Sequence, residues 1–502
     1  MKHLPLILAS GAWSLALATL SCSSSSTTEA GPAPSPNTAC TGVSFPKVPA
    51  DSSSIVYVAK SCPTEGADGT ADHPYNSIQQ GLNKSDKGGA VMVAPGTYDE
   101  SVSVHQGAAI YGSDGDSSDT ARVTIQSSSP YGVTVDSGDG DVILQGLKVI
   151  KPIGAGIWVV SGKASVLASQ VLGSQPTSEH QFGFGILATG GQLTVAKSVV
   201  DGSTQIGVVV QNAAVAISDS RVSNNGAGGV RLEMPLGNAQ LLNNTIEDNI
   251  LSGITILSGQ VTIEGNTISG TNPPGTVSHD IDYSAIGDGI VVGSIKGAVG
   301  VSRVQIHHNK ITNCSRLGLF LTDSAEGEVT ENEVTDNALT TFGAGIWLQG
   351  GVGTETPIKI SGNTIARNRG AGLVLTDLAR ADVSDNKEIS ETILTQVFVG
   401  TETGMIGDGV SIFLGATAKV QNNIIRKNGR AGLIADQASG MSLVDGNQIT
   451  DNLDSGIVVQ NDTTKASFLG TNTFSNNQKM DQHILAPSEK PYFINPGPFK
   501  EH

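Results

Sequence analysis

Basic residues are scarce in this chain, and their scarcity limits the partners that it can have. Lysine and arginine total 29 against 46 aspartates and glutamates, which gives a formal net charge of −17 at pH 7. A protein that grips nucleic acid needs a basic patch for the phosphates. No such patch is visible, so we expect no nucleic-acid partner. A polyanionic sugar meets the same repulsion unless a divalent cation such as Ca²⁺ bridges it or a local basic groove contacts it.

Charged and aromatic residues are also few, at 15% and 4% of the chain, whereas glycine is abundant, with 62 of 502 residues. The glycines follow no collagen-like triplet period. Hydrophobic residues still make up 38% of the chain, so disorder does not explain the glycines. Many short strands joined by tight turns would explain them.

The N-terminal segment is predicted to direct export. Residues 1–21 combine Lys2, an apolar run over 4–20 that is too short for a membrane span, and the ending "TLS" before Cys22. This arrangement resembles a bacterial lipoprotein signal, which implies lipidation of Cys22. Residues 22–53, rich in serine and proline, are then a tether. The predicted location is the cell envelope, lipid-anchored at the outer membrane or cell surface. An ordinary secretory signal, and thus a secreted protein, is the alternative.

Besides Cys22, the chain has only three cysteines. Exported proteins meet oxidising surroundings, and Cys40 and Cys62 flank the start of the predicted folded part, so they could form a disulfide. Cys314 would then be unpaired, and its position in the repeat described next predicts a small buried turn residue.

One unit recurs through most of the chain. It runs small-Gly-aliphatic-x-aliphatic, a turn, an alternating strand and "N-x-[IV]-x-x-N", as in "SGITILSGQVTIEGNTISG" from Ser252. Its glycine stands at 156, 185, 207, 229, 253, 289, 318, 345, 372, 409, 432 and 456, with a minimal spacing of 22 to 24 residues. Three short strands fit this length, whereas a strand-helix-strand crossover does not. Because such a unit cannot bury its apolar face alone, successive copies must stack.

Asparagines at fixed places in the unit support the stacking. Asparagine tolerates left-handed turns, and aligned amides can hydrogen-bond along a stack. One column holds Asn244, Asn266, Asn309, Asn332, Asn363, Asn423, Asn447 and Asn472. A second column holds Asn225, Asn249, Asn337, Asn368, Asn428, Asn452 and Asn477, with Cys314 at the equivalent place in its own unit.

With these repeats, the chain resembles the right-handed parallel β-helix proteins of the pectin-lyase-like class. The opening "AVMVAPGTYDESVSV" and the amphipathic segment at about 75–83 match the first strands and capping helix of that class. The resemblance implies an all-β solenoid of about 12 to 14 coils: an N-terminal cap and first coils over 54–130, repeats over 131–480 and a C-terminal tail over 481–502. Function does not follow, because the class holds lyases, hydrolases, epimerases and proteins without known activity.

The longest inserts fall at one place in the unit, over 173–182, 270–286, 336–342 and 387–406. Loops inserted at one vertex of a solenoid emerge along one edge, where such folds bind. The strand after this vertex has mostly apolar residues at its outward positions, including Trp158, Phe320 and Trp347, and only Arg231, Thr255 and Ser411 are polar. Either the loops cover this stripe, or its aromatic residues bind a glycan or a protein partner.

Acid–base candidates gather in one insert. "SHDID" supplies His279, Asp280 and Asp282, and Asp288 follows at the foot of the loop in "IGDGI". These four residues are the weak catalytic candidates, and Asp280, Asp282 and Asp288 could hold a cation such as Ca²⁺. Asp408, in the similar "IGDGV", would lie about 19 Å from Asp288 at ~4.8 Å per coil, too far for one acid–base pair. We expect both aspartates to be anchors that close a turn, and a role of Asp288 in chemistry is the alternative.

Sequence signatures of known activities of this class are missing. The polygalacturonase motifs and the Asp-Pro-His-Asp of alginate epimerases do not occur, and the nine histidines and six methionines form no cluster suited to copper. The sequence therefore favours a non-catalytic cell-envelope protein that binds a polysaccharide or a cell-surface protein. A polysaccharide lyase or glycoside hydrolase acting at the loop-lined edge is the alternative.

Overall fold

The structure is a computed structural model that describes residues 39–49, 52, 54–176, 183–273, 287–293, 300–339, 343–399, 402–439, 442–461 and 467–494. The described residues belong to one compact unit, Ala39–His502. No helix among them has the length and hydrophobicity needed to cross a membrane.

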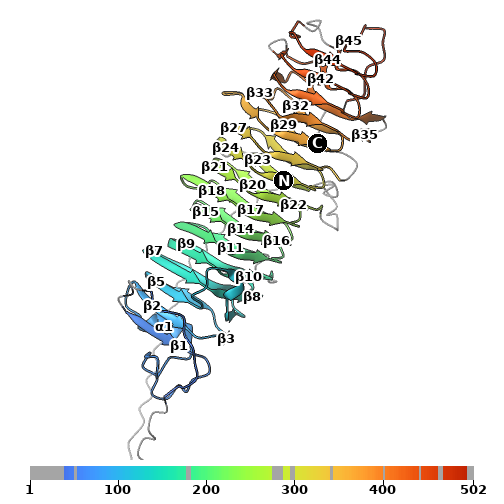
Figure 1. Cartoon of the computed structure of the whole chain (residues 1–502). Coiled ribbons are helices and arrows are strands. Elements are labelled where there is room, and N and C mark those ends of the chain that lie inside the picture. Colours follow the sequence, from blue (N-terminus) through green and yellow to red (C-terminus); the bar gives the residue numbers. More distant parts are fainter. Residues whose placement is uncertain are drawn as a thin grey trace, which may run out of the picture. The chain divides into compact units, whose positions relative to one another are not determined.

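The unit is a stack of coils that follow one another in chain order, from the blue N-terminal coils to the red C-terminal ones (Figure 1). Each complete coil has three strands, and each strand pairs in parallel with its counterparts in the neighbouring coils. The long strands β7 (Tyr131–Gln145) and β9 (Gly154–Leu167) pass through the first and second positions of their coils without interruption. For this reason the first and second positions together form one sheet of 28 strands, and the third positions form another of 15.

The strand bounds follow this three-part order. First positions are taken by β4 (Val102–Val104), β7, β9, β11 (Gly183–Ala188), β14 (Ile206–Gln211), β17 (Gly228–Glu233), β20 (Ser252–Leu257), β23 (Asp288–Gly293), β26 (Leu317–Thr322), β29 (Ala344–Gln349), β32 (Ala371–Thr376), β37 (Asp408–Phe413), β40 (Leu433–Asp436), β43 (Ile457–Gln460) and β45 (Gln482–Ile484). Second positions are taken by β1 (Ile55–Val58), β2 (Gly89–Val93), β5 (Ala108–Tyr111), β7, β9, β12 (Gln192–Ala196), β15 (Ala214–Ser218), β18 (Asn238–Leu242), β21 (Gly259–Glu264), β24 (Ser302–His307), β27 (Ala325–Thr330), β30 (Ile358–Ser361), β33 (Arg380–Ser384), β38 (Thr417–Gln421) and β41 (Leu443–Asp445). Third positions are taken by β3 (Gly96–Tyr98), β6 (Val123–Gln126), β8 (Leu147–Ile150), β10 (Gln170–Leu172), β13 (Val199–Asp201), β16 (Arg221–Ser223), β19 (Thr245–Glu247), β22 (Thr267–Ser269), β25 (Lys310–Thr312), β28 (Glu333–Thr335), β31 (Thr364–Ala366), β34 (Glu388–Ser390), β39 (Ile424–Arg426), β42 (Gln448–Thr450) and β44 (Thr473–Ser475).

A short helix closes the N-terminal end of the stack. Helix α1 (Ile78–Lys84) begins at Ser77, whose side chain accepts a hydrogen bond from the backbone N–H of Gln80. The carboxylate of Glu100 accepts further bonds from the N–H groups of Ile78 and Gln79. The helix buries Ile78 and Leu82. The predictions of an all-β parallel solenoid and of a capping helix are therefore confirmed. The described part also contains the 3₁₀ turn η1 (Ser118–Thr120).

The core consists of aliphatic columns, because alternate strand residues point into the coil and the coils stack in register. Leu241, Ile263, Ile306 and Val329 pair directly in consecutive coils and are fully buried. Burying a side chain of this size contributes about 1.5–3 kcal/mol. The repeat glycines lie where coils approach closely: a Cβ on Gly289 would come within 2.5 Å of the carbonyl oxygen of Gly318.

The predicted asparagine column is a continuous ladder. Asn332 donates from Nδ2 to the side-chain oxygen of Asn363 (3.1 Å) and to the carbonyl of Ile306 (2.8 Å). Its own Oδ1 accepts from the backbone N–H (2.9 Å) and from Nδ2 (3.0 Å) of Asn309. The same side-chain contact joins each consecutive pair among Asn244, Asn266, Asn309, Asn332, Asn363, Asn386, Asn423, Asn447 and Asn472.

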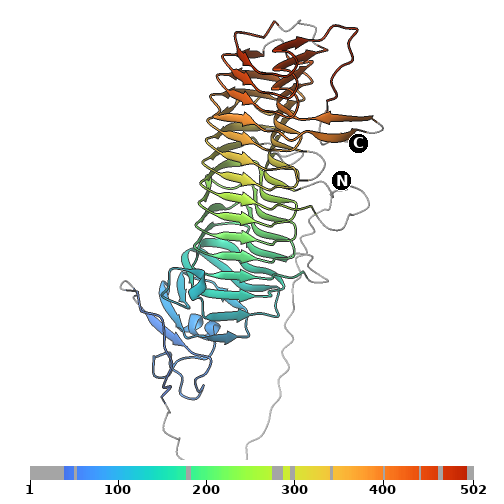
Figure 2. The ribbon, with the colours of Figure 1, turned by 45° about the vertical axis from the view of Figure 1, so that its right-hand side comes forward.

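Two segments depart from the coil pattern. Strands β35 (Thr395–Val399) and β36 (Glu402–Ile406) form an antiparallel hairpin within the insert 387–406, and this hairpin projects from the stack (Figure 2). The predicted C-terminal tail starts with β45, which pairs with β43. Beyond β45, Leu485, Tyr492 and Ile494 pack against the outward side of the first strands.

Candidate functional site

The outward positions of the first strands form one column along the stack, as the repeat predicts. Arg231, Thr255, Val291 and Phe320 pair in register across β17, β20, β23 and β26. Their neighbours in each strand point into the core. The column therefore places one outward side chain from each coil beside the next, about 4.8 Å apart.

A groove of about 270 Å³ lies over this part of the column. The lining contains the polar groups of Arg231, Ser252 and Thr255 and the apolar side chains of Val291 and Phe320. The hydroxyls of Ser252 and Thr255 are hydrogen-bonded at 2.7 Å. The groove thus combines hydroxyls and a cation at one end with an apolar wall at the other.

Arg231 is the more exposed of the two arginines that line this groove, and its side chain is 41% exposed. Its Nε lies 2.5 Å from Glu233 Oε1, and Glu233 also accepts from Gln211 Nε2 at 2.6 Å. Glu233 therefore offsets the charge of Arg231, while the exposed part of the guanidinium can still donate hydrogen bonds to a ligand.

Beyond the groove the column is covered, which corrects the prediction of an aromatic binding platform. Phe320 is 6% exposed and Trp347 is 1% exposed. They belong to a cluster in which the C-terminal residues Leu485, Tyr492 and Ile494 pack over the strands. A ring buried in this way cannot stack on a sugar. Trp347 is therefore part of the packed interior, and Phe320 is accessible only where it lines the groove.

Trp158, the third predicted platform residue, lies six coils before Phe320 in the same column, about 29 Å away at 4.8 Å per coil. Its ring packs on Tyr131 with a centroid distance of 4.5 Å, and its Nε1 donates to Thr189 Oγ1 at 3.1 Å. The three aromatic residues therefore do not form one surface.

Asp288 lies at the end of the groove, where it forms a buried ion pair. Both of its carboxylate oxygens accept from the guanidinium of Arg316, and Oδ1 also accepts from the backbone N–H of Leu317 at 3.2 Å. The side chains are 1% and 5% exposed. The pair ties the start of β23 to the entry of the next coil, so the carboxylate of Asp288 is not available as an acid, a base or a calcium ligand.

Asp408 repeats this arrangement. It accepts from Arg430 Nε at 2.8 Å, from Arg430 Nη2 at 2.5 Å and from the N–H of Ala431 at 3.2 Å. Sequence reasoning anticipated that both aspartates anchor a turn and missed their arginine partners. The sequence does contain a signal for these ion pairs. An aspartate directly precedes the repeat glycine of one coil, and an arginine, Arg316 or Arg430, stands two residues before the repeat glycine of the next coil.

The other predicted catalytic and metal residues, His279, Asp280 and Asp282, lie outside the described residues, as does Cys22. Among described residues, one group of His, Cys, Asp and Glu brings three ligand atoms within 4.8 Å of one another: Glu264, His307 and His308. It lies on a different side of the coil from the groove, at the end of the second strands β21 and β24.

The three described cysteines take the places expected of them. Cys40 and Cys62 form a disulfide with a Cα–Cα distance of 5.6 Å. Cys314 is fully buried, and its backbone N–H donates to Asn337 Oδ1 at 3.1 Å, so it occupies its place in the second asparagine column. Burial raises the pKa of its thiol to about 12, which keeps the thiol protonated and a poor nucleophile near neutral pH.

A larger hollow of about 460 Å³ lies between η1 and the turns that follow the second strands, near Asp116, Lys197 and Arg221. Its two basic residues are already paired: Lys197 lies 3.2 Å from Asp116, and Arg221 lies 2.7 Å from Glu247. The smaller groove at Arg231 combines polar and apolar walls and is therefore the better candidate binding site.

Comparisons with solved structures found distant similarities. The A-module of mannuronan C-5 epimerase AlgE4 from Azotobacter vinelandii is 14% identical, with 87% of this chain and 98% of that chain covered and a TM-score of 0.37. The catalytic unit of the GH87 α-1,3-glucanase from Streptomyces thermodiastaticus strain HF3-3 is 16% identical, with 87% and 71% covered and a TM-score of 0.41. The periplasmic alginate epimerase AlgG is 14% identical, with 78% and 79% covered and a TM-score of 0.39. Similarities of this size do not indicate a shared activity.

No curated protein matches the chain. A family model described as "Right handed beta helix region" matches residues 106–268, 182–353, 281–392 and 352–489. These overlapping matches run without a gap from 106 to 489, well over half of the chain. The resemblance noted in the sequence is thus confirmed: the chain belongs to the family of right-handed β-helix repeat proteins.

Proposed function

We propose that this protein binds carbohydrate, without cleaving it, in the groove formed by Arg231, Ser252, Thr255, Val291 and Phe320. The observation that carries the proposal is the composition of this groove. Sugars present hydroxyls at their edges and C–H groups on their faces, so a sugar site needs hydrogen-bonding groups beside an apolar wall. The groove offers both within about 270 Å³.

The charges around the groove favour a neutral sugar over a uronate polymer. Arg231 is paired with Glu233, and Arg316 is paired with Asp288, so neither arginine presents an uncompensated positive charge. The protein as a whole carries −17, which repels a polyanion. A neutral glycan avoids this repulsion and can still accept hydrogen bonds from Arg231.

The proposal of binding without cleavage rests on two carboxylates, Asp288 in the lining of the groove and Glu233 beside it. Glycoside hydrolysis needs two carboxyl groups about 5–9.5 Å apart on either side of the scissile bond. Asp288 is buried against Arg316, and Glu233 is held by Arg231 and Gln211. Neither carboxylate is therefore placed to transfer a proton to a sugar.

Replacing Arg231 by alanine is expected to weaken glycan binding about tenfold or more, because a hydrogen bond from a charged group contributes about 1.5–3 kcal/mol. Glycan-array screening of the purified protein would identify the ligand, and calorimetry would measure its affinity. Thr255→Phe, which fills the groove, should have a similar effect. Arg303→Ala is the matched control, since Arg303 is an exposed, ion-paired arginine on β24 and does not line the groove.

Two results would count against this proposal. Unchanged affinity in both Arg231→Ala and Thr255→Phe would place the glycan elsewhere. New reducing ends or unsaturated products from the bound polysaccharide would instead support the alternative of a lyase or hydrolase.

We also propose that the protein reaches the cell envelope as a lipoprotein anchored through Cys22. The tether predicted over 22–53 must end before Ala39, because Ala39 begins the compact unit and Cys40 is disulfide-bonded to Cys62. The support is the sequence before and at Cys22, with its apolar run over 4–20. Cys22→Ser is expected to move the protein from the membrane fraction to the soluble fraction, because a lipidated cysteine anchors through its buried acyl carbons. Membrane association that survives this substitution would refute the anchor.

A further inference from the structure

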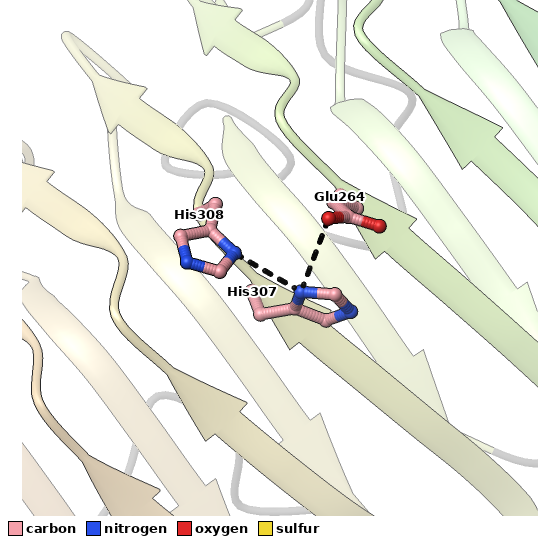
Figure 3. A group of neighbouring side chains, drawn as sticks. All are labelled: Glu264, His307 and His308. Atoms are coloured by element: carbon pink, nitrogen blue, oxygen red, sulfur yellow. Dashed lines mark hydrogen bonds and ion pairs between the residues drawn. The ribbon is translucent and has the colours of Figure 1, made fainter.

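Two consecutive histidines and a glutamate meet at one corner of the stack, away from the proposed glycan groove. Glu264 ends β21 and His307 ends β24, and the two residues pair directly in register. His308 follows in the turn with φ 56°, in the left-handed region. Figure 3 shows a ring nitrogen of His308 directed at a ring nitrogen of His307, with the Glu264 carboxylate beside His307.

The distances match those between ligands of one metal ion. His307 Nδ1 lies 3.2 Å from His308 Nδ1 and 3.8 Å from Glu264 Oε1. Two nitrogens bound to one tetrahedral ion at about 2.0–2.1 Å would lie about 3.3–3.4 Å apart. The two nitrogens are thus already spaced as such ligands, and the carboxylate needs only a small movement to join them.

Glu331, in the following coil, orients the second histidine. Its Oε2 lies 2.7 Å from His308 Nε2. If Nε2 carries the proton that this carboxylate accepts, the lone pair of the neutral ring is on Nδ1, the atom that faces His307. Metal-binding histidines commonly donate their other ring N–H to a carboxylate in this way.

The corner is open to solvent on one side. Gly265, which directly follows Glu264, donates its backbone N–H to the carbonyl of His307. The side chain of His308 itself is exposed. An ion can therefore enter without a rearrangement of the coils. Without an ion, an N–H of one ring can donate to the other, which accounts for the same 3.2 Å contact.

We propose that Glu264, His307 and His308 bind one divalent transition-metal ion, such as Zn²⁺, with Glu331 as the positioning residue. Imidazole nitrogens favour zinc and its neighbours over calcium and magnesium, which prefer oxygen ligands. The protein supplies three ligands, so water completes the coordination. Because Glu264 and His307 come from successive coils, the ion links these coils.

The test is a titration of chelator-treated, tag-free protein with ZnCl₂, followed by calorimetry. We expect saturable binding of one ion per chain and a higher midpoint of thermal unfolding in the presence of zinc. CaCl₂ should give neither effect. His307→Ala and His308→Ala should each weaken zinc binding by at least about tenfold, since loss of even an outer partner typically weakens binding 10- to 100-fold.

His105→Ala is the matched control, because His105 is an exposed histidine in the N-terminal coils and its loss should leave zinc binding unchanged. Glu331→Ala should weaken binding without changing the unfolding midpoint of the ion-free protein, and Glu331→Gln, which keeps an acceptor oxygen, should restore much of the affinity. No saturable binding, or equal binding by the His307→Ala/His308→Ala double variant, would overturn the proposal.

Discussion

Replacing Asn332 by alanine is expected to lower the free energy of unfolding by about 1–3 kcal/mol. The side-chain oxygen of Asn332 is the acceptor for the backbone N–H of Asn309, which is buried and loses this partner. The amide of Asn309 keeps its bonds to the carbonyls of Ile263 and His307. Each buried donor left without an acceptor costs about 1–3 kcal/mol. The substitution also removes the donor that serves the carbonyl of Ile306. No water reaches these groups without the coils separating.

Chemical denaturation followed by circular dichroism would measure this loss. Asn238→Ala is the matched control: Asn238 is an exposed asparagine whose amide bonds only to Thr262 at the surface, and its loss should change the free energy of unfolding by no more than about 0.5 kcal/mol. Equal effects of the two substitutions would mean that the ladder adds little to the stability of the stack.

The ladder also shows how far sequence reasoning reaches. Eight of its asparagines were predicted from their spacing, because each precedes an apolar residue by two positions. Asn386 was missed, since one extra residue separates it from Ile389. The structure nevertheless places Asn386 between Asn363 and Asn423, and Ile389 pairs with Ile365. The register of each strand is set by its pairing with the neighbouring coils. The extra residue between Asn386 and Ile389 is therefore accommodated in the turn, which the spacing in the sequence does not predict.

The candidate sites were harder to predict because their residues meet across coils and are far apart in the sequence. The histidines were judged to be unclustered, and this was wrong: His307 and His308 are consecutive, and their partner Glu264 lies 43 residues earlier, beyond an insert. Likewise Trp347 belongs to a cluster against which the C-terminal residues Leu485, Tyr492 and Ile494 pack. Periodicity predicts which residues point outward, whereas the position of inserts and of the chain end decides which of them stay exposed.

Replacing Asp408 by alanine is expected to lower the free energy of unfolding by about 3–5 kcal/mol, because removing one partner of a buried ion pair leaves an uncompensated charge. The charge left behind is that of Arg430, which is buried and also donates from Nη1 to the carbonyls of Met405 and Phe493 at 2.7 and 2.8 Å. Asp382→Ala is the control. Asp382 pairs with Lys419 at the surface, with side chains 44% and 52% exposed, and such pairs contribute about 0–1 kcal/mol.

Asp288→Ala should cause a similar loss of stability, but amide hydrogen exchange should speed up in different segments of the chain than in Asp408→Ala. Arg430 joins the hairpin residue Met405 to the C-terminal residue Phe493, so Asp408→Ala should speed amide hydrogen exchange in both segments. Asp288 is bonded to Arg316 and Leu317, and its loss should leave exchange in the C-terminal segment unchanged.

In the double variant Asp408→Leu/Arg430→Met, most of the stability should return, since apolar residues of similar size commonly replace a buried pair without loss. The part that does not return reflects the two carbonyl bonds of Arg430 and the bond from the backbone N–H of Ala431 to Asp408. A loss in Asp408→Ala no larger than in Asp382→Ala would show that the buried pair does not stabilise the coils.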